Sequence, residues 1–344
     1  MKKRIQYLEG LRVFSMFCVV LIHVCMTAIT DFPDYSFGHP AGVVFYCIRN
    51  FCHFAVPVFF MITGALFLNP EKELPIDKLI KKYLVKYVAV LVLFGWGFAL
   101  IEEVFKYHNF RATYLFNSFR NMVEGNSWEH MWYLYDLIGI MLIMPVLRAM
   151  AKGLSTREMR YVMVVMLIFL SVIPLFTKIT NIEIGIVFPF NNVYVMYVLL
   201  GWELSQNRIK CPQWLCWIVI VMSLGVCLLD AELYIMRDVN YGLAGYSSPV
   251  IMALSISVFT LFKENISQNE NRISERVIPF ISNLSFSVYL VHMFWINLLY
   301  KAVKFNPLKG LFPIRMLCIW AVVSALSIVT AFIMKKIPLL KKIV

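Results

Sequence analysis

Ten strongly apolar stretches follow one another along this chain of 344 residues, and short polar segments separate them. Most have about the ~20 residues that a helix needs to cross ~30 Å of hydrocarbon, where only helices and closed barrels satisfy the backbone. The chain is 60% hydrophobic and 15% charged, and we expect no separate soluble domain because the polar segments between the apolar stretches are short. We therefore predict an all-α, polytopic membrane protein with about ten transmembrane helices, forming a single domain over residues 1–344. The expected spans are 11–29, 42–68, 82–101, 131–149, 159–176, 187–204, 213–230, 246–262, 280–300 and 313–334.

The basic residues are distributed unevenly between the two sides of the predicted membrane. Of 32 Lys and Arg residues, 21 lie in segments that are cytoplasmic if the N-terminus is inside, and 8 lie in the outer loops. This is the positive-inside pattern, and it places both termini in the cytoplasm. The net charge of +12 is explained by topology, so it does not indicate nucleic-acid binding.

The first apolar stretch contains two ionisable residues, Arg12 and His23. Eleven residues place them on nearly the same helix face, about 16 Å apart along the axis. Ionisable groups inside a span are costly and are functional candidates by default. The alternative is a histidine that bonds to a neighbouring helix for packing alone. Arg12 would lie at the cytoplasmic end and His23 in the outer half.

Further polar residues fall in the outer half of other predicted spans. Arg49 lies about 10 Å and His53 about 16 Å below the outer boundary, at a depth similar to that of His23. Pro57 removes a backbone donor and is expected to kink that long span. His292 in the ninth span reaches a comparable level. We predict a shared polar cavity in the outer half of the bundle, to which Asp136, Asn191 and Asn192 also contribute, although each residue alone also fits a structural role.

The remaining candidates lie nearer the two membrane surfaces. Asp136 is about one turn into the fourth span and is the only acid clearly inside a span. Lys82 and Lys86 stand at the cytoplasmic end of the third span, where they bind donor phosphates or simply anchor the helix to anionic lipid. The outer connection 103–130 is rich in Asn, Arg and aromatic residues. It forms either a short amphipathic helix over an outer opening, where a sugar stacks, or an interfacial aromatic belt.

Several short motifs in this order resemble the acyltransferase 3 family of integral membrane acyltransferases, over nearly the whole chain. Within that family the chain is most similar to the branch that O-acetylates surface polysaccharide, of the enterobacterial common antigen type. The matching motifs are Arg12-VFSMFCVVLI-His23, Val56-PVFFMIT-Gly64, His130-Met-Trp132-Tyr133 with Pro145, Gly201-Trp202 and Tyr289-Leu-Val-His292.

The resemblance implies acetyl-CoA as a cytoplasmic co-substrate and a hydroxyl of a surface or lipid-linked glycan as acceptor. It implies that Arg12 and His23 are the essential pair, with His23 as base or as transient acyl carrier. Candidate substrate-binding or oxyanion residues are Arg49, His53, Asp136, His292, Tyr289 and Trp132. Two positions depart from the family pattern: Thr63 replaces a serine, and His53 stands where related sequences often carry arginine.

Membrane lipid is the other expected partner, and the expected location is the inner membrane of a bacterium. No metal-ligand spacing occurs in the sequence, so no metal is expected. The competing hypothesis is a transporter or flippase of a glycan or another polar solute. Such proteins often use paired acids at the midplane, whereas here three histidines and a single acid fall inside spans.

Overall fold

The computed structural model describes residues 6–107, 111–266 and 272–344, and these residues form helices and connections without a strand. Within these ranges eight helices are long and apolar enough to cross a membrane. They are α1 (Gln6–Asp31); α3 (Pro40–Cys52) with α4 (Ala55–Phe67); the series α5 (Ile76–Lys78), η1 (Leu79–Leu84), α6 (Val85–Val90), η2 (Leu91–Gly95) and α7 (Trp96–Tyr107); η3 (Glu129–Met131) with α9 (Trp132–Gly153); the series α10 (Thr156–Leu167), η4 (Ile168–Val172) and α11 (Ile173–Thr180); α13 (Gln213–Arg237); α15 (Arg272–Asn297) with η5 (Leu298–Ala302); and α16 (Phe312–Met334).

Two of the ten expected spans have no counterpart among these eight helices. The stretch 187–204 becomes the 13-residue helix α12 (Val193–Ser205), because Asn192 caps its first turn by accepting a hydrogen bond from the Tyr194 amide, 2.8 Å away. At 1.5 Å per residue this helix is about 20 Å long, shorter than the hydrocarbon layer. The stretch 246–262 becomes α14 (Pro249–Ile266), whose last turns carry Lys263 and Glu264. The remaining helices are α2 (Pro33–Ser36), α8 (Thr113–Val123) and α17 (Pro338–Ile343).

The chain divides into two compact units, each built from segments that are distant in sequence. The first comprises Met1–Leu68 and Gly153–Ala331, and the second comprises Asn69–Lys152 and Phe332–Val344. In the second unit α7 packs against α8, and α17 packs against α6. The connection 103–130 contains a short helix, α8, which presents Phe116 and Val123 as exposed side chains. Residues 108–110 of that connection lie outside the described residues.

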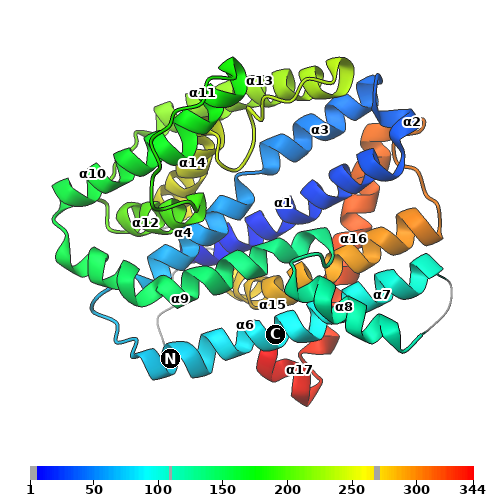
Figure 1. Cartoon of the computed structure of the whole chain (residues 1–344), viewed down its shortest axis with the longest axis horizontal. Coiled ribbons are helices and arrows are strands. Elements are labelled where there is room, and N and C mark those ends of the chain that lie inside the picture. Colours follow the sequence, from blue (N-terminus) through cyan, green and yellow to red (C-terminus); the bar gives the residue numbers. More distant parts are fainter. Residues whose placement is uncertain (1–5, 108–110, 267–271) are drawn as a thin grey trace. The chain divides into compact units, whose positions relative to one another are not determined.

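Helix α1 is the packing centre of the first unit and contacts α3, α4, α14 and α15 (Figure 1). Helices α1 and α15 are parallel, because Arg12 contacts Ser282 and His23 contacts His292, so both residue numbers rise together. Helix α16 is antiparallel to α1, since Trp320 donates to the Phe17 carbonyl whereas Cys25 contacts Met316. These relative directions agree with spans that alternate across a membrane.

Two glycines bring α4 and α12 into backbone contact. A Cβ placed on Gly64 would overlap the carbonyl oxygen of Val198, and a Cβ placed on Gly201 would overlap that of Met61. Small residues allow helix backbones to approach closely where lipid gives little hydrophobic drive for association. Helix α12 is accordingly buried along residues 195–204.

The second predicted span is broken where the sequence indicated a kink. Helix α3 ends at Cys52, and α4 begins at Ala55 after a turn at His53 and Phe54. Pro57 has no amide hydrogen, so the carbonyl of His53 loses its helical partner four residues later. The turn separates His53 from the regular helical ladder and places it between the two helices.

Candidate active site

The histidines of α1 and α15 face each other. Their imidazole centroids are 5.0 Å apart, with an interplanar angle of 49°. His292 is fully buried, and its Nδ1 lies 2.7 Å from the carbonyl oxygen of Tyr289. Because a carbonyl oxygen only accepts, Nδ1 carries the hydrogen and Nε2 is the basic nitrogen. His23 is only half-buried, so it is the more accessible member of the pair.

Arg49 lies close enough to both His23 and His53 to interact electrostatically with each of them. Its guanidinium stands 4.9 Å from the centroid of the Tyr46 ring, and its Nη1 donates to Asn50 Oδ1 at 2.9 Å. The planar guanidinium is suited to this combination of an aromatic face and a fixed hydrogen bond. Of the residues predicted to share a polar cavity, the structure thus brings together His23, Arg49, His53 and His292, whereas Asn192 caps α12.

His53 is held by the loop that precedes α14. Its Nδ1 donates to the Ala244 carbonyl at 2.7 Å, and its ring lies 4.6 Å from the Tyr246 ring. The other nitrogen, Nε2, is buried and has no hydrogen-bond partner within the described parts of the chain. Like His292, a neutral His53 in this tautomer presents an acceptor nitrogen.

Arg12 lies on α1, toward the opposite end from His23. Helix α1 runs without interruption from Gln6 to Asp31, so the separation of about 16 Å between Arg12 and His23 holds. The Arg12 side chain is half-buried, and its Nη1 lies 3.5 Å from the hydroxyl of Ser282 on α15. Arg12 and His23 both face α15, at two points along its length. Tyr289, one turn before His292, supplies the carbonyl that orients the His292 ring.

The other predicted site residues belong to the second unit. Trp132 begins α9, and Asp136 lies half-buried one turn later. Lys82 is exposed, and Lys86 lies near both Lys82 and Lys335 in a cluster of like charges. Lys335 was not singled out in the sequence, because it lies more than 200 residues away. Whether these residues serve the histidine cluster stays a prediction.

The expectation that Asp136 is the only acid inside a span is wrong. Asp230 is buried on α13, which continues to Arg237, beyond the expected end of that span at residue 230. Glu203 is fully buried on α12. Both acids stand within apolar runs, which is a signal that the sequence offered.

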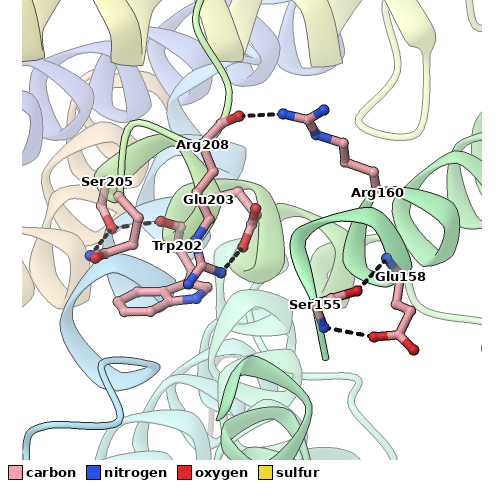
Figure 2. Close-up of polar contacts among 8 residues, drawn as sticks. Ser155, Glu158, Arg160, Trp202, Glu203, Ser205 and Arg208 are labelled. Atoms are coloured by element: carbon pink, nitrogen blue, oxygen red, sulfur yellow. Dashed lines mark hydrogen bonds and ion pairs between the residues drawn. The ribbon is translucent and has the colours of Figure 1, made fainter. Parts of the chain in front are cut away.

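Glu203 anchors the end of α12 (Figure 2). Its Oε1 accepts from Arg208 Nη1 at 3.0 Å, and the backbone carbonyl of Arg208 accepts from Arg160 at 2.9 Å. Lys263 of α14 donates to the carbonyls of Leu204 and Ser205. Cations near the last carbonyls of a helix stabilise its C-terminus. Because Glu203, Arg208 and Lys263 stabilise the C-terminus of α12, we assign them a structural role.

Comparison with known families places the chain. A family model described as an acyltransferase domain, that of the acyltransferase 3 family, matches residues 5–336. No curated protein and no solved structure gave a significant match. The matched region contains all of the motifs from Arg12 to His292. The chain is a multi-pass membrane acyltransferase and belongs to the acyltransferase 3 family.

Proposed function

We propose that this protein is an O-acyltransferase that moves an acetyl group from cytoplasmic acetyl-CoA to a hydroxyl of a surface or lipid-linked glycan. The acceptor would be of the enterobacterial common antigen type or a similar polysaccharide. The observation that carries the proposal is the pair His23 and His292, which lies beside Arg49 and about 16 Å along α1 from Arg12. The proposed location is the inner membrane of a bacterium, with both termini in the cytoplasm, on the basis of the asymmetry in basic residues.

In the proposed reaction His23 acts as the general base. It removes the proton of the acceptor hydroxyl as the oxygen bonds to the thioester carbonyl carbon. The tetrahedral intermediate then collapses, the carbon–sulfur bond breaks, and the thiolate of CoA leaves and takes up the proton. Base catalysis of this kind contributes about 10²–10⁴-fold. In a variant of this reaction, a nitrogen of His23 attacks the thioester carbon, the carbon–sulfur bond breaks and the CoA thiolate leaves. The acceptor oxygen then attacks the acetyl-imidazole, the nitrogen–carbon bond breaks, and the hydroxyl proton passes to the freed imidazole.

The hydrogen-bond pattern divides the remaining roles. Neutral His53 and His292 each have their Nδ1 hydrogen engaged by a backbone carbonyl, so each offers an acceptor to a sugar hydroxyl or to an N–H of His23. An oxyanion needs donors, and Arg49 is the donor-rich group of the cluster. We therefore assign oxyanion stabilisation to Arg49 and hydroxyl orientation to His53 and His292.

The donor would enter from the Arg12 end of α1. An extended pantetheine arm is long enough to cover the distance from Arg12 to His23, so the two residues act on different parts of one substrate. Lys82 and Lys86, with Lys335 beside them, are proposed to bind the phosphates of CoA. Trp132, Asp136 and Tyr289 are proposed to contact the sugar.

The test uses purified protein in lipid nanodiscs with radiolabelled acetyl-CoA, together with mass spectrometry of surface glycans from cells with and without the protein. We expect label to move to the glycan and His23→Ala to abolish the transfer. His39→Ala is the matched control, because His39 is exposed at the start of α3, ten residues or about 15 Å along that helix from Arg49. Near-normal transfer by folded His23→Ala protein would refute the assignment. Counterflow of an unmodified glycan without acetylation would favour the alternative of a transporter. Membership of an acyltransferase family does not support that alternative.

A further inference from the structure

A buried hydrogen-bonded chain connects Arg49 to α13. The Oδ1 of Asn50 accepts from Arg49, and its Nδ2 donates to Asp230 Oδ2 at 3.0 Å. The second carboxylate oxygen, Oδ1 of Asp230, accepts from the amide of Leu243 at 3.0 Å. Asn50 is fully buried and Asp230 is 4% exposed. This series of hydrogen bonds from Arg49 therefore leads to a buried carboxylate, which lies within the apolar sequence of α13.

Side chains form hydrogen bonds with several backbone groups of the loop before α14. Besides the Leu243 amide, the carbonyl of Ala244 accepts from His53, and the carbonyl of Tyr246 accepts from the hydroxyl of Tyr197 at 2.7 Å. Ser248 donates to the Leu243 carbonyl. Fixed backbone groups of this kind give the loop a defined position over the break between α3 and α4.

Asp230 thus stands at the junction of two routes to the proposed site. One runs through Asn50 to Arg49, and the other runs through Leu243 and Ala244 to His53. Asp230 also interacts electrostatically with Arg49, so it supplies the opposite charge that an arginine inside a bundle requires. Neither Asn50 nor Asp230 approaches the histidine pair in any contact described above, so they act through other residues.

We propose that Asp230 is a positioning residue for acyl transfer, holding Arg49 through Asn50 and His53 through the Leu243–Ala244 backbone. This inference rests on the proposed function, because it assumes that Arg49 and His53 act on the reacting groups. It extends that function to α13 and to the loop before α14, which the motifs of the family resemblance do not include.

The hydrogen bonds between Arg49, Asn50 and Asp230 suggest two single variants and their combination as a test of the proposal. In Asp230→Asn, the NH2 group of the introduced amide meets the NH2 group of Asn50. A flip of Asn50 would turn a donor toward Arg49, and a flip of the introduced amide would turn a donor toward the Leu243 N–H, so one bond is always lost. In Asn50→Asp, two carboxylates face each other. Combining the two changes restores every bond. The carboxylate introduced at position 50 accepts from both Arg49 and the amide introduced at position 230, and the oxygen of that amide still accepts from the backbone N–H of Leu243.

We expect each single variant to lower the turnover number about tenfold or more, and the double variant to return within about threefold of the wild type. The KM for acetyl-CoA should not change, because the donor enters at the other end of α1. Hydrogen exchange should show faster exchange of the Leu243 amide in Asp230→Asn. Glu232→Gln is the control, since Glu232 lies on the same helix in an exposed ion pair with Arg237.

A folded Asp230→Asn protein with wild-type turnover would overturn the proposal, and so would a folded double variant as inactive as the singles. If the single variants fail to fold, the double variant decides alone. Turnover within about threefold of the wild type would support the proposal, and a folded but inactive double variant would overturn it. The failure of the proposed function looks different: wild-type protein would then transfer no acetyl group at all, and His23→Ala would change nothing.

Discussion

Replacing Gly201 by alanine should loosen the contact between α4 and α12, and the structure indicates by how much. The new Cβ would fall so close to the Met61 carbonyl oxygen that the backbones must part by about 1 Å to restore an ordinary distance. Overpacking of this kind costs about 1–3 kcal/mol. Neither atom is the flexible end of a side chain, so the strain cannot be relieved by a rotamer change.

The matched control is Gly225→Ala. Gly225 lies in the middle of α13, where an added Cβ meets nothing within 4 Å. There alanine should stabilise by about 0.5–1 kcal/mol, because it loses less backbone entropy than glycine in a helix. The two variants have the same chemistry, so the sign of the effect isolates the packing.

The assay is thermal unfolding of the purified variants in one detergent, followed by tryptophan fluorescence. We expect Gly201→Ala to melt several degrees below the wild type and Gly225→Ala at or above it. If Gly201→Ala melts as high as Gly225→Ala, the backbone contact between α4 and α12 does not exist as described.

Three further variants test the site itself. His292→Asn, which loses the basic nitrogen, should lower turnover about 10²-fold without changing the KM for acetyl-CoA, and an unchanged turnover would remove His292 from the mechanism. Arg12→Lys keeps the charge but gives up the fork that reaches Ser282, so it should raise the KM for acetyl-CoA more than it lowers turnover; the reverse split would contradict a donor-side role. Pro57→Ala restores the amide that the carbonyl of His53 lacks, so we expect a straighter helix with an equal or higher melting temperature and about tenfold slower transfer, and wild-type transfer would show that the break is dispensable.

Local patterns in the sequence predicted most of the helices but not their exact number. Long apolar runs gave eight helices of the expected kind. The helix in the sixth expected span begins later than predicted, because apolar residues 187–190 belong to an irregular segment and Asn192 sets the start of α12. Hydropathy measures how a residue partitions between water and membrane, and it does not describe the capping bond that sets where a helix begins.

The common level of the histidines was predicted from depth, because a helix rises by a constant amount per residue, but depth does not specify which helices are neighbours. Partner choice is a different matter. The contact between Asn50 and Asp230 joins residues 180 positions apart, and no periodicity within either helix specifies it. Asp230 was passed over for that reason, although a lone acid in an apolar run is itself informative.

The parallel alignment of α1 and α15 sets a rigid interval between the two ends of the proposed reaction path. Arg12 faces Ser282 and His23 faces His292, eleven residues apart on one helix and ten on the other. A shift of one helix by one turn along the other would separate both pairs at once, so both contacts depend on a single register between α1 and α15. In the proposed reaction, helix geometry would therefore fix the distance between the entry of the donor at Arg12 and its thioester at His23, and a donor with a shorter arm would not reach His23.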